Sequence, residues 1–158
     1  MTQISLTLNG KKLEMAVEPR QLLVDFIRNS AQKTGSHIGC DTSYCGACTV
    51  LFDGRSAKSC TMFAVQADGA DIRTVESLED ETGEINVLQK AFASNHALQC
   101  GFCTPGFLMS ATHLLRHNRD PSEEDVRKGL SGNVCRCTGY QGIIAAVLEA
   151  AAELRETP

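Results

Sequence analysis

The chain has 158 residues and a formal net charge of −4; 42% of the residues are hydrophobic and only 5% are aromatic. This length suits one average domain or two small ones, and the absence of a basic run argues against nucleic acid as the main partner. No stretch approaches the roughly 20 apolar residues that span a bilayer. The N-terminus lacks the pattern of a signal peptide, so we expect a cytoplasmic protein whose eight cysteines stay reduced.

The first half of the chain is predicted to be a small mixed α/β unit. Two stretches of alternating polar and apolar residues flank Asn9-Gly10, and a second such turn is Asp53-Gly54. Both dipeptides favour tight hairpin turns. Leu22, Leu23, Phe26 and Ile27 then recur at helical spacing. We expect, in order, strands at 4–8 and 12–17, a helix around 22–27, a loop rich in Gly and Cys at 35–48, strands at 49–52 and 55–59, and a short strand at 72–75.

The second half is predicted to be helical, after an acidic segment at 76–83 that reads as a soluble linker. Ser122 is a plausible N-cap, because three acidic residues follow it in the first turn of a helix. The other apolar residues with helical spacing predict one helix over 85–92, one over 107–115 and a last one from about Tyr140 through Leu148.

Four cysteines of the first half have the spacing Cys40-x4-Cys45-x2-Cys48, and Cys60 follows. A [2Fe–2S] cluster needs four thiolates, and this spacing is that of plant-type ferredoxins. Small residues beside the cysteines allow backbone N–H groups to point at such a cluster. A zinc site or a pair of disulfides is the alternative, although zinc more often uses two C-x2-C knuckles or a mixture of Cys and His. The spacing therefore favours a cluster in this half.

The other four cysteines are Cys100-x2-Cys103 and Cys135-x-Cys137. Thr-Pro-Gly follows Cys103 as at a helix start, and the later pair precedes the last predicted helix. Thiolates at helix N-termini have an electropositive setting that suits an anionic cluster. Spacing alone leaves zinc open for this set, and also a redox-active C-x-x-C, although no thioredoxin-like context surrounds it.

Histidine offers a further metal candidate. His113 and His117 stand four residues apart on a predicted helix and could share a metal ion. Such a pair is more often simply solvated, and the eight thiolates already account for the expected metal. We therefore leave both histidines out of the predicted sites.

Three motifs together carry a family resemblance: residues 39–50 with Cys60, Gln99-Cys-Gly-Phe-Cys-Thr-Pro-Gly106, and Gly132-Asn-Val-Cys-Arg-Cys-Thr-Gly-Tyr140. In order and spacing they resemble the iron–sulfur subunit of the molybdenum hydroxylases, the family of xanthine dehydrogenase, aldehyde oxidase and carbon monoxide dehydrogenase. The match spans nearly the whole chain, with all eight cysteines in place. It favours a cluster over zinc in the second half as well.

The resemblance implies an α+β fold. A β-grasp, ferredoxin-like [2Fe–2S] domain at 1–76 would be followed by a linker at 77–83 and an all-α four-helix bundle that binds a second [2Fe–2S] cluster at 84–158. The ligands would be Cys40, Cys45, Cys48 and Cys60 in the first domain and Cys100, Cys103, Cys135 and Cys137 in the second.

The resemblance also implies a function and two kinds of partner. The chain would relay electrons from a molybdopterin site in a large subunit to FAD in a medium subunit of an oxidoreductase. Gln99 and Cys137 would lie against the pterin cofactor, and no catalytic residue is expected on this chain. Two other functions stay open on the sequence alone: a stand-alone, two-cluster electron carrier, and an interaction module stabilised by zinc.

Overall fold

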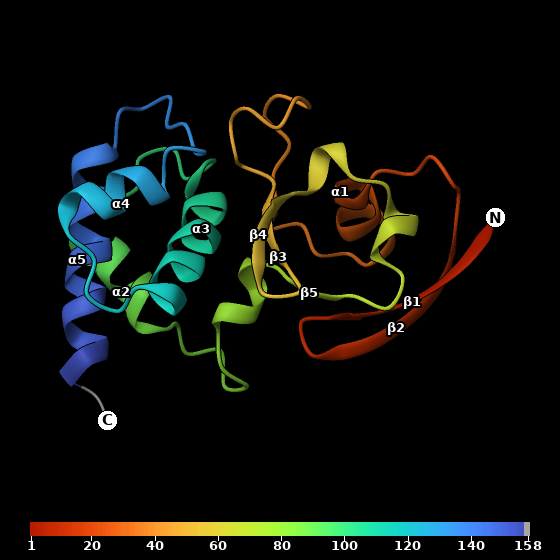
Figure 1. The fold of residues 1–158 in the computed structure, drawn as a ribbon, viewed down its shortest axis with the longest axis horizontal. Coiled ribbons are helices and arrows are strands. Elements are labelled where there is room, and N and C mark those ends of the chain that lie inside the picture. The colour runs from red at the N-terminus through yellow and green to blue at the C-terminus, as the bar shows by residue number, and fades with distance from the viewer. Residues whose placement is uncertain (157–158) are drawn as a thin grey trace.

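The computed structural model describes residues 1–156. Figure 1 shows two parts side by side: a sheet with a short helix, formed by the first half of the chain, and a group of helices formed by the second half. This arrangement confirms the predicted α+β fold. None of the helices in this range is both long and apolar enough to cross a membrane.

The sheet of the first half has five strands. They are β1 (Thr2–Leu8), β2 (Lys11–Val17), β3 (Thr49–Phe52), β4 (Arg55–Lys58) and β5 (Asp71–Arg73), in the spatial order β2-β1-β5-β3-β4. The last strand in the sequence lies at the centre, parallel to β1 and antiparallel to β3. Two hairpins are thus joined through β5, and β4 forms one edge of the sheet.

Both hairpin turns have the predicted conformation. Asn9 and Gly10 have φ values of 51° and 80°, and Asp53 and Gly54 have values of 48° and 79°. Two successive residues with positive φ define the tight turn whose twist matches paired strands. The pairs Leu8–Lys11 and Phe52–Arg55 close the two ladders directly at these turns. The residue types of each turn therefore set the register of its hairpin.

One face of the sheet is covered by a short helix, as the spacing of apolar residues predicts. Helix α1 (Leu23–Asp25) continues as a wider π-helical turn over Phe26–Ser30, in which the N–H of Ala31 donates to the C=O of Phe26, five residues back. Leu23, Phe26 and Ile27 are fully buried and pack with the inward side chains of β1 and β5. Their burial anchors the loop that follows, which carries the first cysteines.

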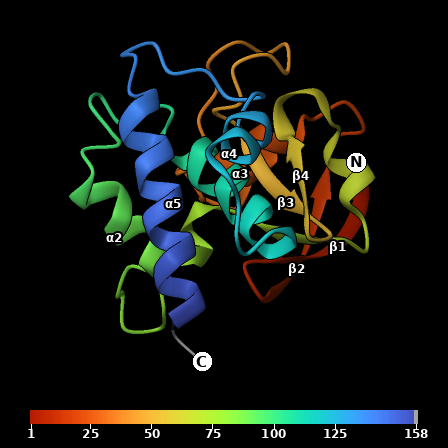
Figure 2. The ribbon, with the colours of Figure 1, turned by 60° about the vertical axis from the view of Figure 1, so that its left-hand side comes forward.

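Four helices lie between residues 84 and 156: α2 (Val87–Ser94), α3 (Thr104–His117), α4 (Glu123–Gly129) and α5 (Tyr140–Glu156). Figure 2 shows α2 beside α5, with α3 between these helices and the sheet. Phe92, Phe107 and Ile143 are buried at the centre of their common core. The predicted cap is confirmed, because the side chain of Ser122 accepts the N–H of Asp125 at the start of α4.

The segment predicted as a soluble linker is attached to the fold. Residues Val75–Leu78 form one 3₁₀ turn after β5, and Val75 and Leu78 are partly buried against the core of the helices. The side chain of Glu76 reaches back to accept the N–H of Gly35 at 2.9 Å. The sequence predicted a strand that ends at Val75, but β5 ends at Arg73. Val75 packs on the core of the helices instead of continuing the strand.

The two parts of the molecule meet where α3 lies against β3 and β4. Gly106, in the first turns of α3, is buried, and a Cβ atom there would lie 2.1 Å from the carbonyl oxygen of Gly46. Gly46 itself has a φ of 75°, and a Cβ atom on it would lie 2.4 Å from the carbonyl oxygen of Gly132. Only glycine permits this approach of three backbone segments. The contact brings the two cysteine-bearing regions together.

Candidate metal centres

The first set of cysteines comes from two segments of the ferredoxin-like half. Cys40, Cys45 and Cys48 lie on the loop between the α1 region and β3, and Cys60 lies in the 3₁₀ turn that follows β4. Cys48 and Cys60 are only 1% and 3% exposed, whereas Cys40 and Cys45 are partly accessible. The β3–β4 pairing brings the two segments together, because Thr49 after Cys48 pairs with Lys58 before Cys60.

The thiols of this set contact one another in pairs. The thiol of Cys45 interacts with that of Cys40, and the thiol of Cys48 interacts with that of Cys60. Burial, followed by the contact with Cys60, raises the pKa of Cys48 to about 11. Burial and the nearby Cys40 also raise the pKa of Cys45. Burial disfavours the charged thiolates of these residues, so a bound cation would be needed to keep them deprotonated together.

The loop around this set is shaped to support sulfur. The N–H groups of Thr42 and Cys45 donate to Cys40 Sγ at 3.4 and 3.3 Å. The pKa of Cys40 is lowered to about 6, first by a hydrogen bond from the Thr42 hydroxyl and then by these two N–H groups. A Cβ atom on Gly39 would lie 2.9 Å from Cys45 Sγ, so any larger residue would crowd that sulfur. Backbone donors and this small residue fit a thiolate-ligated iron–sulfur group.

The second set lies at the N-terminal ends of two helices, as predicted. Cys103 immediately precedes α3, with Pro105 in the first turn, and Cys137 lies three residues before α5. Cys100 is exposed and Cys135 is 9% exposed. Unpaired N–H groups at helix starts favour negative charge. This placement therefore fits an anionic group held by thiolates.

The thiols of the second set also contact one another in pairs. The thiol of Cys100 interacts with Cys137, and that of Cys103 interacts with Cys135. Burial, followed by the contact with Cys135, raises the pKa of Cys103 to about 12. In each set, the thiols interact in two pairs. The cysteines of each set come from two separate segments of the sequence. No cysteine forms a disulfide.

Some polar groups around the second set donate hydrogen bonds to sulfur, and one buried hydroxyl has no hydrogen-bond partner among the described residues. The N–H of Gly139 donates to Cys135 Sγ at 3.3 Å, and the N–H of Cys135 donates to the hydroxyl oxygen of Tyr140 at 2.9 Å. Thr104, directly after Cys103, has a buried hydroxyl with no hydrogen-bond partner among the described residues. Such an orphaned donor is costly unless an acceptor fills the site. The donor set fits a sulfur-rich cofactor.

A backbone hydrogen bond joins the two segments that carry the cysteine sets. The N–H of Val134, next to Cys135, donates to the carbonyl oxygen of Cys45 at 2.9 Å. One residue of the first set is thereby joined through the backbone to one residue of the second. This contact could not be predicted from the sequence, because it depends on how the two halves dock.

A chain of polar side chains accompanies this link. The Lys58 ammonium donates to Thr49 Oγ1 at 2.9 Å, and the Thr49 hydroxyl donates to the Gly46 carbonyl at 2.7 Å. Asn133 Nδ2 donates to the same carbonyl at 3.0 Å, and its Oδ1 accepts the Ser110 hydroxyl at 2.7 Å. The chain runs from β4 to α3 across the contact between the halves. Gly46, Thr49 and Asn133 lie within the sequence motifs, but the sequence did not predict that they form a chain with Lys58 and Ser110.

Asn133→Ala should destabilise the contact between the halves. Asn133 and Ser110 are each only 5% exposed, so the substitution leaves a buried hydroxyl and weakens the partnering of the Gly46 carbonyl. We expect a loss of about 2–3 kcal/mol, seen as a fall in Tm of roughly 5–10 °C by calorimetry. The exposed Asn29 provides the control. Asn29→Ala should change the stability by less than about 0.5 kcal/mol, and equal effects of both substitutions would contradict the bridging role.

In cluster-free, folded protein the thiols should react at different rates. At pH 7 we expect iodoacetamide to label Cys40 early, because its pKa of about 6 leaves it mostly thiolate. Cys48 and Cys103, with pKa values of about 11 and 12, should react slowly. Lowering the pH through about 6 should slow the labelling of Cys40. Peptide mass spectrometry measures each site; similar rates in folded and urea-unfolded protein would contradict the assigned environments.

Gln99 lies beside Cys137 on the surface of the helical half. Its side-chain amide donates to the Cys137 carbonyl at 2.8 Å, and the side chain is exposed. The nearby Leu98 and Phe102 are 45% and 47% exposed. The surface around the second set therefore carries uncovered apolar side chains next to a cysteine pair.

The histidine pair set aside at the sequence level has ordinary partners. The rings of His113 and His117 lie 4.4 Å apart between centroids, and His113 Nδ1 lies 3.2 Å from the Gly54 carbonyl oxygen. His117 Nδ1 lies 2.8 Å from the His113 carbonyl oxygen. Within residues 1–156, no three Cys, His, Asp or Glu side chains converge as ligands of a single ion would. The case for the cysteine sets rests on their pairing and their donors.

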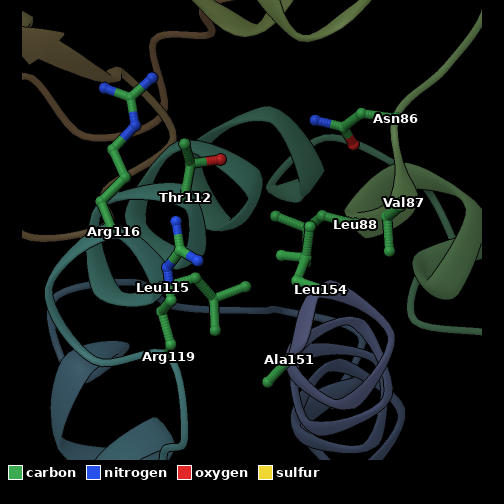
Figure 3. A pocket seen from close by; sticks show the side chains of 9 residues that line it. All are labelled: Asn86, Val87, Leu88, Thr112, Leu115, Arg116, Arg119, Ala151 and Leu154. Carbon is green, nitrogen blue, oxygen red and sulfur yellow. The ribbon is translucent and has the colours of Figure 1, made fainter. Parts of the chain in front are cut away.

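A separate cavity of about 510 Å³ lies among α2, α3 and α5. Figure 3 shows Arg116 and Arg119 on the α3 side, with Leu88 and Leu154 lining the other side. The cavity is lined by the N-terminal end of α2 and by the C-terminal ends of α3 and α5. The second cysteine set lies at the opposite ends of α3 and α5, so this cavity is not part of that site.

Comparison with known proteins accounts for both halves. Residues 6–73 match the family described as the 2Fe-2S iron-sulfur cluster binding domain, and residues 74–148 match the [2Fe-2S] binding domain. The nicotine 6-hydroxylase small subunit of Paenarthrobacter nicotinovorans is 51% identical over 152 residues, which cover 96% of this chain and 91% of that protein. The caffeine dehydrogenase subunit gamma of Pseudomonas sp. (strain CBB1) is 52% identical over 147 residues, covering 91% and 87%.

A solved structure agrees with the whole fold. In the crystal structure of quinoline 2-oxidoreductase from Pseudomonas putida 86, one chain superposes with a TM-score of 0.94 at 46% identity. The match covers 99% of this chain and 97% of that chain. Both halves of the molecule, and their docking, are therefore shared with that protein.

The fold and its two cysteine sets define a protein with two [2Fe–2S]-binding domains. More particularly, the chain belongs to the family of small iron–sulfur subunits of the molybdenum hydroxylases. It is an electron-transfer subunit of an oxidoreductase, and the alternative of a stand-alone carrier is not favoured.

Proposed function

We propose that two sets of four cysteines hold the two clusters. The first set is Cys40, Cys45, Cys48 and Cys60, and the second is Cys100, Cys103, Cys135 and Cys137. The observation that carries this assignment is that a backbone N–H donates to a cysteine sulfur in each set, from Cys45 to Cys40 Sγ and from Gly139 to Cys135 Sγ. When bound, each cluster supplies one-electron chemistry. The chain itself supplies the thiolates, the donors and the apolar surroundings.

The proposed domain limits follow the same division. We place the ferredoxin-like domain at 1–76, a connecting segment at 77–83 and the helical domain at 84–158. Two separate hydrophobic cores support this division, one under the sheet and one among the helices. Val75 and Leu78 contact the helical core, so the connection is short and held in place.

The chain is proposed to relay electrons from a molybdopterin site in a large subunit to FAD in a medium subunit. The names of similar proteins, such as a small subunit and a subunit gamma, support an assembly of several chains. The hydrogen bond from Val134 to Cys45 supports the relay, because it gives a short backbone connection between the two cysteine sets.

Gln99 and Cys137 are proposed to face the molybdopterin subunit. Gln99 is exposed and bonded to the Cys137 carbonyl, and Leu98 and Phe102 leave apolar surface uncovered beside them. Exposed apolar surface next to polar groups is typical of a protein interface. Cys137 would then serve both as a cluster ligand and as part of the contact with the pterin. The complex is proposed to be cytoplasmic, where cysteines stay reduced.

Purification of the tagged chain from its own cells tests the partners. We expect a large chain that contains molybdopterin and a medium chain that contains FAD to copurify with it in equal amounts. Gln99→Glu should weaken recovery of the large chain, since the new carboxylate cannot donate to the Cys137 carbonyl. Recovery of a fully loaded chain without either partner would favour the stand-alone carrier instead.

A further inference from the structure

The side chain of Lys58 is an ammonium without a carboxylate partner. Lys58 ends β4 and is half-buried, and no Asp or Glu lies within ion-pair distance of it among the described residues. Its one hydrogen bond is to the hydroxyl of Thr49, at 2.9 Å. A partly desolvated cation is unfavourable unless negative charge lies nearby. Negative charge close to the Lys58 ammonium would therefore stabilise it.

The first cysteine set lies beside Lys58 along the backbone. The Lys58 ammonium is bonded to the hydroxyl of Thr49, the residue directly after Cys48. Backbone geometry places Lys58 two residues before Cys60 and directly across the ladder from Thr49, which follows Cys48. Four thiolates around an oxidised [2Fe–2S] core leave a net charge of about −2, and one-electron reduction makes it about −3.

The position of the ammonium is fixed by the contact between the halves. Thr49 is only 1% exposed, and its hydroxyl donates to the Gly46 carbonyl, which also accepts from Asn133. On the other side, a Cβ atom on Gly132 would lie 3.4 Å from Lys58 Nζ. The charge therefore lies between the first cysteine set and the segment that leads to Cys135.

We propose that Lys58 compensates the charge of the first cluster and raises its reduction potential, so that this cluster accepts an electron more readily. The inference rests on the proposed cysteine ligands. A fixed positive charge stabilises the more negative, reduced state, and hydrogen bonds and charge near the sulfurs are among the factors that set cluster potentials. The same charge makes electron arrival from the second cluster more favourable.

The test is a dithionite titration of the purified complex, monitored by EPR. The signal that Cys48→Ser abolishes identifies the first cluster. Lys58→Gln keeps a donor for Thr49 but removes the charge, and Lys58→Arg keeps the charge. We expect Lys58→Gln to lower the equilibrium constant for reduction at least about tenfold, or 59 mV for one electron, and Lys58→Arg to leave it near the wild-type value. Lys11→Met, at the opposite edge of the sheet, is the control.

The outcomes separate charge from structure. An unchanged potential in Lys58→Gln overturns the inference, and so does an equal fall in Lys58→Gln and Lys58→Arg, which would indicate a structural role. If Lys58→Gln binds less iron, Thr49→Val decides, because it releases the ammonium without removing it. A lowered potential in Thr49→Val supports the inference, and an unchanged one overturns it. Wild-type complex without a first-cluster signal would instead overturn the ligand assignment itself.

Discussion

Cys48→Ser is expected to remove the first cluster and to lower the iron content from about four to about two atoms per chain. Cys48 is 1% exposed and contacts Cys60, so its thiolate faces the interior of the site and no solvent ligand can easily replace it. A serine hydroxyl has a much higher pKa than a thiol and is a poor ligand for iron. One of two EPR signals of the reduced protein should disappear.

The reciprocal substitution in the second set is the control for Cys48→Ser. Cys103→Ser replaces a thiol with a similarly raised pKa, at the start of α3. It should abolish the other EPR signal and leave the first one in place. Loss of both signals in both variants would show that neither set forms a separate site. Unchanged iron in either variant would contradict the assignment of that cysteine.

Gly106→Ala is expected to separate the two halves of the molecule. The added methyl group would lie 2.1 Å from the Gly46 carbonyl oxygen, and this neighbour is backbone that cannot rotate away. Alanine is the better helix former by about 1 kcal/mol, but overpacking of this kind costs about 3 kcal/mol or more. We expect a net fall in Tm of roughly 5–10 °C, together with easier loss of iron during purification.

A glycine without this constraint provides the matched control. A methyl group on Gly132 would make only ordinary van der Waals contacts, with Lys58 Nζ at 3.4 Å and with Lys58 Cε at 3.8 Å. Gly132→Ala should therefore change Tm by only a few degrees. Equal falls in Tm for Gly106→Ala and Gly132→Ala would contradict the view that α3 needs a glycine to approach the first cysteine loop.

Local chemistry explains why much of the fold could be predicted. Asn9-Gly10 and Asp53-Gly54 determine their turns almost alone, and Ser122 with the following acids determines the start of α4. The cysteine spacing was informative for a similar reason, because three of the first four cysteines lie on one loop. In each case the signal lies within a few residues of sequence.

Contacts between the halves could not be predicted in the same way. The Lys58 to Ser110 chain joins residues far apart in the sequence, and each of them has an ordinary role when considered alone. The acidic composition of 76–83 suggested a free linker, but Val75 and Leu78 pack on the helical core. The wider turn at 26–30 also escaped prediction, because helical spacing alone does not distinguish it from an α-helix.

Iron and acid-labile sulfide per chain, measured with EPR of the dithionite-reduced protein, test the central claim most directly. Two clusters held by the two cysteine sets predict about four irons, about four sulfides and two distinct S = 1/2 signals. About two irons with one signal, or zinc in the helical half, would contradict the claim and would leave the second set of cysteines with a structural role only.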